Sequence, residues 1–152
     1  MGVDREAAMR HRTVREIMTD GALCQRAPTQ SVRDACCLMA DARLSGVLVT
    51  ERGRLVGIFT ERDAFCRVFA RALDPDATRL GDVMTKDPET AAPGDSVADA
   101  IRRMDEFGYS HLPVVEGERV VGLLALRDLS IQDLAAMHAE LEYRHAFAER
   151  AW

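Results

Sequence analysis

Apolar residues recur at helical spacing in two separate segments of the chain. One segment carries Val32, Ala35, Cys36 and Met39, and the other carries Val97, Ala100, Ile101 and Met104. The intervals of three and four residues place each set on one face of a helix. Ser31 and Ser96 precede these runs, and each has an aspartate three residues later, which is typical of a capped helix start. The pattern therefore predicts two helices, each with one buried face.

Two short runs of branched apolar residues follow each predicted helix, separated by a glycine turn. They cover residues 47–50, 54–59, 112–115 and 119–124. Runs of this composition and length are typical of strands, and continuous apolar character fits strands that helices cover. After Thr60, a further helix is predicted whose apolar face consists of Phe65, Val68, Phe69 and Leu73.

The whole pattern occurs twice. Gly57 and Asp63 have counterparts 65 positions further on, at Gly122 and Asp128, and each copy opens on a Met-Thr pair. The pattern therefore favours two self-similar subdomains over a long repeat array. The predicted fold class is α+β, with two tandem β-α-β-β-α repeats at residues 13–73 and 80–135 that are related by a pseudo-twofold axis.

The second repeat continues into a helical pattern that the first repeat lacks. Leu134, Leu141 and Ala148 follow one another at heptad spacing, so we predict an appended helix and assign residues 136–152 to a C-terminal helical extension. His138, Glu142 and His145 share a stripe there, but one exposed helix offers too few ligands for a metal site. Residues 1–12 form a polar N-terminal extension.

Charge and composition exclude several classes of partner. The formal net charge is −5 and the pI is about 5.4, whereas nucleic-acid binding requires a concentrated basic surface. No apolar run approaches the ~20 residues of a membrane helix, and the charged start carries no signal peptide, so we expect a cytoplasmic protein. The four cysteines have no disulfide or zinc spacing. Cys36 aligns with the apolar Ile101 and Cys37 with the charged Arg102, so we expect Cys37 to be the more reactive of these two thiols.

The order and duplication of these motifs resemble the tandem CBS domain pair, or Bateman module, over residues 13–135. The resemblance rests on the openings at residues 14–19 and 80–85, the strand at 110–115, and the segments 57–63 and 122–128. It implies a stand-alone regulatory module that binds an adenosine-containing ligand (AMP, ADP, ATP, NAD or S-adenosylmethionine) in the cleft between the repeats. It also implies a homodimer. Because no effector segment is recognisable in the chain, the output is expected to reach an unknown partner protein in trans.

The resemblance also implies which residues bind the ligand. The two glycines allow close approach, Asp63 and Asp128 accept from ribose hydroxyls, and helix starts with a threonine receive phosphate. Arg62 and Arg127 supply charge, strand residues flank the adenine, and Lys86 and His111 lie near the pocket. The full candidate set is Thr19, Val47, Val49, Gly57, Thr60, Arg62, Asp63, Thr85, Lys86, His111, Leu112, Val114, Gly122, Arg127 and Asp128.

The sequence leaves two alternatives open. Thr60 and Asp63 also have the spacing of a capping box, so Asp63 has a structural explanation without a ligand. Ala125 replaces that threonine in the second copy, which predicts two unequal sites and favours, as the alternative function, a ligand-free dimerisation module with degenerate pockets. No catalytic motif is present; His111 with Asp128 is the only plausible acid/base couple, and we expect no enzyme and no catalytic cofactor.

Overall fold

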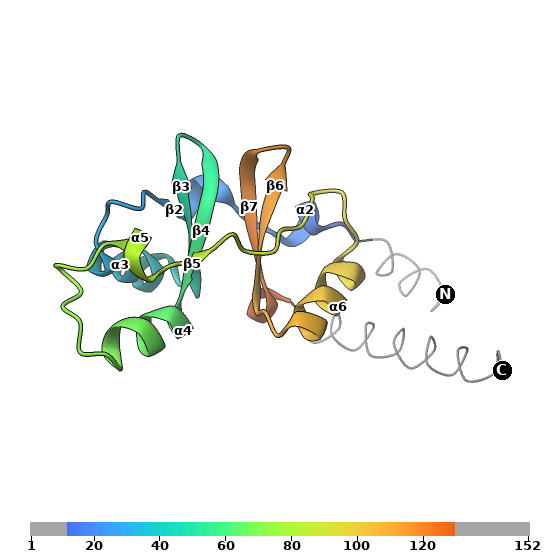
Figure 1. The fold of residues 1–152 in the computed structure, drawn as a ribbon. Helices are drawn as coiled ribbons and strands as arrows, with labels where there is room; N and C mark the ends of the chain where they lie inside the picture. The colour runs from blue at the N-terminus through green and yellow to red at the C-terminus, as the bar shows by residue number, and fades with distance from the viewer. Residues whose placement is uncertain (1–11, 130–152) are drawn as a thin grey trace, which may run out of the picture.

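The computed structural model describes residues 12–129, and they form two lobes side by side, each built around a β-hairpin (Figure 1). The C-terminal helical extension, the last residues of the second repeat and most of the N-terminal extension lie outside the described residues. The helices are α2 (Val14–Ile17), α3 (Val32–Ala42), α4 (Glu61–Asp63), α5 (Leu80–Val83) and α6 (Val97–Phe107). Two 3₁₀ turns, η1 (Gly21–Leu23) and η3 (Leu126–Asp128), and a π-helix, η2 (Ala64–Phe69), complete the helical elements of residues 12–129.

The predicted strands form two equivalent hairpins. In the first lobe β3 (Gly46–Glu51) pairs with β4 (Arg54–Thr60), and in the second β6 (His111–Glu116) pairs with β7 (Arg119–Ala125), both antiparallel. The register shifts after Val49 in one hairpin and after Val114 in the other. Since these irregularities occur at matching positions, the fold repeats with its sequence, which confirms the α+β class and the internal symmetry.

Helices α3 and α6 begin as the serine pattern predicts. The Ser31 and Ser96 hydroxyls each accept a hydrogen bond from the backbone N–H three residues on, at 3.1 Å. Both helices end at a residue in the left-handed region, Arg43 at φ 55° and Gly108 at φ 73°. Seven of the eight predicted core positions are buried, while Cys36 is half-buried.

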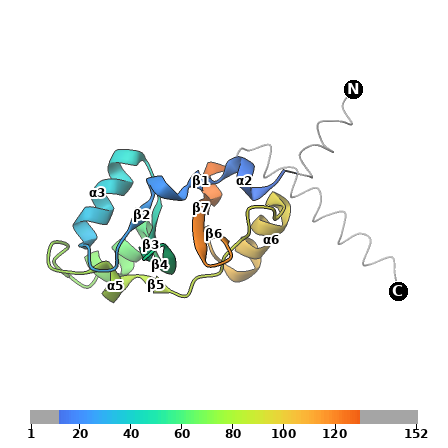
Figure 2. The same ribbon diagram turned by 90° about the horizontal axis from the view of Figure 1, so that it is seen from above.

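The Met-Thr openings exchange lobes. The short strand β1 (Thr19–Asp20) pairs with β7, whereas β5 (Thr85–Lys86) pairs with β4, so each opening lies beside the hairpin of the other repeat (Figure 2). The core follows the same exchange, because Val14 packs in the second lobe and Leu80 in the first. The sequence repeats 13–73 and 80–135 therefore differ from the spatial lobes.

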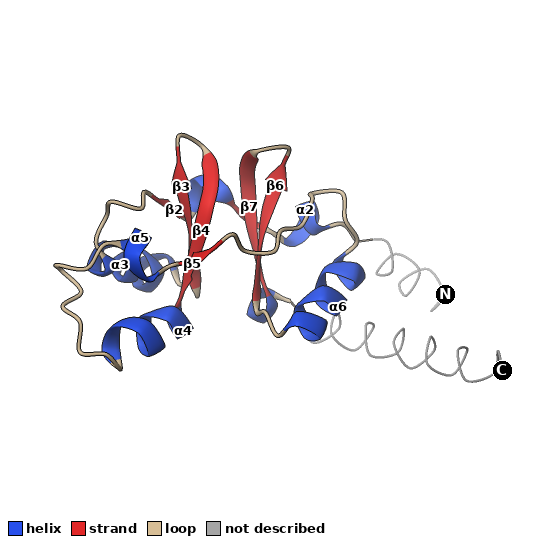
Figure 3. Ribbon diagram, viewed as in Figure 1, coloured by secondary structure: helices blue, strands red, loops and turns tan. Residues whose placement is uncertain are grey.

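The two hairpins also share a core of their own. Strands β1, β7, β4, β3 and β2 (Gln25–Arg26) follow one another in a seven-stranded sheet, with β5 and β6 off this path (Figure 3). The apolar side chains that join the hairpins are Cys24, Leu48, Ile58, Val120 and Leu123. This shared core connects the two lobes.

The segment after Thr60 corrects one prediction. It is helical, as α4 and η2, but only Val68 of its four apolar positions is buried. Phe65 is 64% exposed, Phe69 is 76% exposed and Leu73 is 41% exposed. The prediction that Leu73 belongs to this helix was wrong, because the helical segment ends at Phe69. The exposed apolar residues line an open groove opposite α3.

Candidate functional site

A cavity of about 510 Å³ lies between the two lobes, and we call it the inter-lobe cavity. One wall comes from β4, α4, η2 and β5, and the other comes from the segment before α6 and the connection from α6 to β6. The lining residues are Ile58, Thr60, Arg62, Asp63, Cys66, Arg67, Thr85, Pro88, Glu89, Phe107, Gly108, Tyr109, Ser110 and His111.

Asp63 is the buried carboxylate of this cavity, at 8% exposure. Its Oδ2 accepts from the Thr60 backbone N–H at 3.0 Å, and the Asp63 N–H donates to the Thr60 hydroxyl at 3.3 Å. The capping box that the sequence allowed is therefore formed. Thr85 donates its hydroxyl to Asp63 Oδ1 at 3.2 Å, so the exchanged opening of the second repeat reaches the same carboxylate.

Two arginines give this wall its positive charge. Arg67 lies 3.5 Å from Asp63 Oδ1 and donates to the Met84 carbonyl at 2.9 Å, which orients it. Arg62 is exposed at the cavity and, within the described range 12–129, has no hydrogen-bond or ion-pair partner. A guanidinium in that state is available to an anionic ligand, because its five N–H donors are otherwise satisfied by water.

His111 is held in place on the opposite wall. Its Nε2 lies 2.7 Å from Ser45 Oγ, and its Nδ1 lies 3.0 Å from Ser110 Oγ. Gly46 provides room for the ring, since a Cβ there would meet the imidazole at 3.2 Å. Burial lowers the pKa of His111 from its ordinary value, more than nearby Asp128 raises it. The imidazole is thus a neutral hydrogen-bonding group at physiological pH.

Five of the predicted site residues come together in the inter-lobe cavity: Thr60, Arg62, Asp63, Thr85 and His111. The cavity also contains groups that the sequence pattern did not indicate, above all Arg67, Glu89, Phe107 and Tyr109. The aromatic pair carried a signal, because the equivalent positions of the first repeat hold Ala42 and Leu44. Departures between the copies mark where the two sites differ.

The prediction that strand valines and a leucine flank the adenine was wrong. Val47, Val49, Leu112 and Val114 have no exposed surface and belong to the cores of the two lobes. Ile58 is the apolar strand residue among those that line the inter-lobe cavity. The pleat explains the difference, since alternate residues of a strand face opposite sides.

The two glycines also have a different role from the predicted one. A Cβ on Gly57 would lie 2.5 Å from Met84 Sδ and 2.8 Å from the Thr85 carbonyl, and a Cβ on Gly122 would meet Met18 and Thr19 at the same distances. The close approach is therefore made by the exchanged openings rather than by a ligand. Thr19 pairs with Leu123 and Lys86 pairs with Gly57, and neither lines the inter-lobe cavity.

The second predicted site has a different arrangement. Arg127 donates to the Arg43 carbonyl at 2.6 Å and lies 3.5 Å from Glu61, so it ties the two lobes together. Asp128 is exposed in the short turn η3, and Ala125 provides no side-chain cap. Neither Arg127 nor Asp128 lines the inter-lobe cavity.

Other kinds of site find no support among residues 12–129. No cluster of three or more histidine, cysteine or carboxylate side chains could hold a metal ion there. Within the same range, no helix is both long and apolar enough to cross a membrane. The stripe of His138, Glu142 and His145 lies outside the described residues.

Comparison with known proteins matches the repeat pattern. The CBS domain family model matches residues 27–68 and 80–131. The CBS domain-containing protein CBSCBSPB2 of Arabidopsis thaliana is 34% identical over 146 residues, which cover 93% of this chain and 27% of that protein. The chain thus spans about a quarter of the length of this curated relative.

Solved structures have the same architecture. The CBS domain protein PAE2072 from Pyrobaculum aerophilum, solved in complex with AMP, superposes with a TM-score of 0.68 at 25% identity and covers 80% of this chain and 99% of its own. The hexameric CBS-CP12 protein from bloom-forming cyanobacteria gives a TM-score of 0.72 at 27% identity, covering 80% of this chain and 71% of its own.

Proposed function

Because this chain belongs to the CBS-domain family, whose members are regulatory and signal-transduction modules, we propose that it is a sensor of an adenosine-containing ligand. The ligand binds in the inter-lobe cavity, with its ribose near Asp63 and its phosphate near Arg62. Candidate ligands are AMP, ADP, ATP, NAD and S-adenosylmethionine. The signal passes to a partner protein in trans, and the chain itself carries out no reaction.

The observation that carries this proposal is Arg62. It lines the inter-lobe cavity, is exposed, and has no hydrogen-bond or ion-pair partner within residues 12–129, while the neighbouring Arg67 is held by Asp63 and a carbonyl. A guanidinium binds phosphate oxygens with two parallel hydrogen bonds. The AMP complex of the Pyrobaculum aerophilum protein favours AMP as the first ligand to test.

Ligand binding would also change the relative orientation of the two lobes. The inter-lobe cavity is lined by Asp63 from the first repeat and by His111 from the second, so a ligand in it contacts both. A ligand shifts a conformational equilibrium only through its differential affinity for the two states. A ligand that contacts both lobes has an affinity that depends on the angle between them, because a change in this angle alters the contacts.

The test is calorimetric titration of the protein with the five candidate ligands. We expect Arg62→Ala to weaken the binding of phosphate-bearing ligands about 10-fold or more, consistent with ~1.5–3 kcal/mol for a hydrogen bond to a charged group. Asp63→Asn, which keeps a capping oxygen, should weaken all ribose ligands. Arg71→Ala, an exposed arginine of the same region that does not line the inter-lobe cavity, is the charge-matched control.

Two outcomes would contradict the sensor. If the folded wild-type protein released no heat with any of the five ligands, the function would be that of a dimerisation module. If Asp128→Asn abolished binding while Asp63→Asn did not, the ligand would occupy the second site instead.

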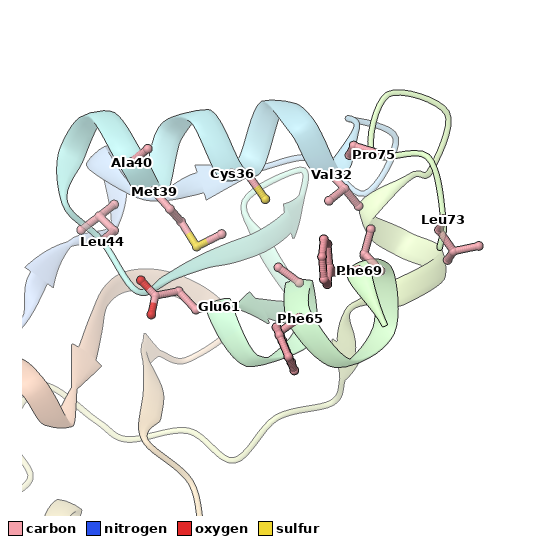
Figure 4. A pocket seen from close by; sticks show the side chains of 12 residues that line it. Val32, Cys36, Met39, Ala40, Leu44, Glu61, Phe65, Phe69, Leu73 and Pro75 are labelled. Atoms are coloured by element: carbon pink, nitrogen blue, oxygen red, sulfur yellow. The ribbon is translucent and has the colours of Figure 1, made fainter. Parts of the chain in front are cut away.

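A separate observation supports the alternative function, which is dimerisation. An apolar groove of about 500 Å³ lies between α3 and the α4–η2 segment, lined by Val32, Cys36, Met39, Ala40, Leu44, Glu61, Ala64, Phe65, Val68, Phe69, Leu73 and Pro75. Figure 4 shows Val32 and Cys36 of α3 facing Phe69 across it. An exposed apolar surface of this kind marks an interaction site. We propose a second copy of this chain as its occupant, and the hexameric cyanobacterial neighbour supports assembly of like chains. Dimerisation and ligand sensing use different surfaces and are compatible.

A further inference from the structure

The charged side chains that line the inter-lobe cavity sum to zero. They are two arginines, Arg62 and Arg67, and two carboxylates, Asp63 and Glu89. The charge that a ligand meets therefore depends on which of these four groups are already paired within the protein.

Arg67 and Asp63 compensate one another. The Arg67 guanidinium lies 3.5 Å from Asp63 Oδ1 and also donates to the Val83 carbonyl at 3.3 Å and to the Met84 carbonyl at 2.9 Å. Arg67 can therefore turn toward a phosphate only by giving up these contacts and leaving the buried Asp63 carboxylate without its cation, which is costly. The pair adds no net charge to the cavity.

Glu89 keeps part of its negative charge. It is exposed at the cavity, and its ion-pair partner Arg103 lies 3.7 Å away. Arg103 also lies 3.6 Å from Asp95 and donates to the Thr90 carbonyl. One guanidinium is thus shared between two carboxylates, so it neutralises Glu89 only in part.

Arg62 is the cation that remains available. Among the lining residues of the described range 12–129, no lysine and no further arginine is present besides Arg62 and Arg67. One guanidinium binds one phosphate group through two parallel hydrogen bonds. A second or third phosphate finds no free cation in the lining, and Glu89 repels it.

We propose that the inter-lobe cavity selects its ligand by phosphate number, so that it binds a nucleoside monophosphate and discriminates against the corresponding di- and triphosphates. This inference rests on the proposed function, and it adds the charge class of the ligand. Arg62 provides the attraction for the single phosphate, and Glu89 is the residue that determines the discrimination.

Calorimetric titration with AMP, ADP and ATP in a buffer without divalent cations tests the selection. We expect affinity to fall in that order, with ATP at least about 10-fold weaker than AMP, because each added phosphate increases the unbalanced negative charge. Glu89→Gln removes the repulsion and should reduce the difference to about 3-fold or less. Glu89→Lys adds a second cation, and ATP should then bind at least as tightly as AMP. Glu106→Gln is the matched control, since Glu106 is an exposed carboxylate of α6 that does not line the cavity, and it should leave the ratio of the two affinities unchanged.

A second measurement uses the wild-type protein and does not depend on how the variants fold. Added salt screens the repulsion between exposed charges, so the ratio of AMP affinity to ATP affinity should decrease as the sodium chloride concentration is raised. If ATP binds the wild type as tightly as AMP, or if both Glu89 variants keep the wild-type ratio, selection by phosphate number is overturned and the sensor stands. If none of the five adenosine ligands binds the folded protein, both proposals are overturned.

Discussion

His111 is a titratable side chain whose environment differs from water. It is hydrogen-bonded to Ser45 and Ser110, and the charged groups that influence it are Asp128, Arg127, Glu61 and Asp63. Burial is the largest effect and lowers the pKa of His111 below its ordinary value. The folded state therefore favours the neutral imidazole.

This shift predicts a pH-dependent stability. Between the lowered pKa of the folded state and the ordinary pKa of the unfolded chain, the unfolded state binds more protons, so the free energy of unfolding falls as pH falls. The contribution of His111 is complete above its unfolded pKa of about 6.5 and is lost as pH decreases toward the folded value. Urea denaturation at pH 7.5 and 5.5 should show that the free energy of unfolding falls less between these pH values for His111→Gln than for the wild type. Equal losses would show that His111 does not carry this dependence.

The four cysteines should differ in reactivity. Burial raises the pKa of Cys24 to about 12 and raises that of Cys36 as well, and a thiol reacts as its thiolate. Cys37 and Cys66 are exposed, so iodoacetamide at neutral pH should label these two in the native protein. Because Cys66 lines the inter-lobe cavity, saturating AMP should slow its labelling while Cys37 remains the internal control. Unchanged labelling of Cys66 would place AMP elsewhere.

At the scale of elements, the exchanged openings depend on two glycines. Gly57 and Gly122 have the same surroundings, because a Cβ added at either would lie 2.5 Å from a methionine Sδ and 2.8 Å from a threonine carbonyl. The carbonyl belongs to a paired strand, so it cannot move without disturbing β5 or β1. Glycine is needed here for close backbone contact between repeats.

Alanine at either glycine should therefore destabilise the protein. We expect Gly57→Ala and Gly122→Ala each to lower the free energy of unfolding by ~1–3 kcal/mol, the usual cost of overpacking. Gly94→Ala is the matched control, because a Cβ there would meet nothing within 4 Å, and it should be neutral or slightly stabilising. Urea denaturation measures all three. A loss as large for Gly94→Ala as for the other two would refute the packing explanation.

At the scale of the whole molecule, the apolar groove predicts self-association. Phe65 and Phe69 stack at 6.0 Å between ring centroids and remain largely exposed, which leaves a surface that a second copy can bury. Light scattering coupled to gel filtration should give a dimer at micromolar concentration, and Phe65→Ser with Phe69→Ser should shift it to monomer. Leu23→Ser, an equally exposed apolar position outside the groove, should not. A wild-type monomer would exclude the second copy as occupant.

The local chemistry of each repeat could be predicted from the sequence, since helix starts, turns and strands depend on neighbouring residues. Ser31 and Ser96 cap their helices, the two hairpins form, and Thr60 with Asp63 makes its capping box. The inequality of the two sites was also visible, in Ala125 and in the absence of aromatic residues at positions 42 and 44. Five of the cavity residues, Thr60, Arg62, Asp63, Thr85 and His111, were named through the resemblance to the tandem CBS domain pair, which rests on short stretches of sequence.

Tertiary structure alone decided which copy each opening joins and which strand face meets the inter-lobe cavity. Val14 and Leu80 occupy equivalent positions of the two repeats and are both apolar. The sequence pattern therefore does not reveal that each packs in the lobe of the other repeat. Val47 and Val114 lie in continuous apolar runs within their strands, and such runs lack the alternation that would identify the outer face. The wall of Glu89, Phe107 and Tyr109 arises only when the lobes meet. Sequence determines contacts between neighbours along the chain, whereas a site between lobes depends on long-range packing.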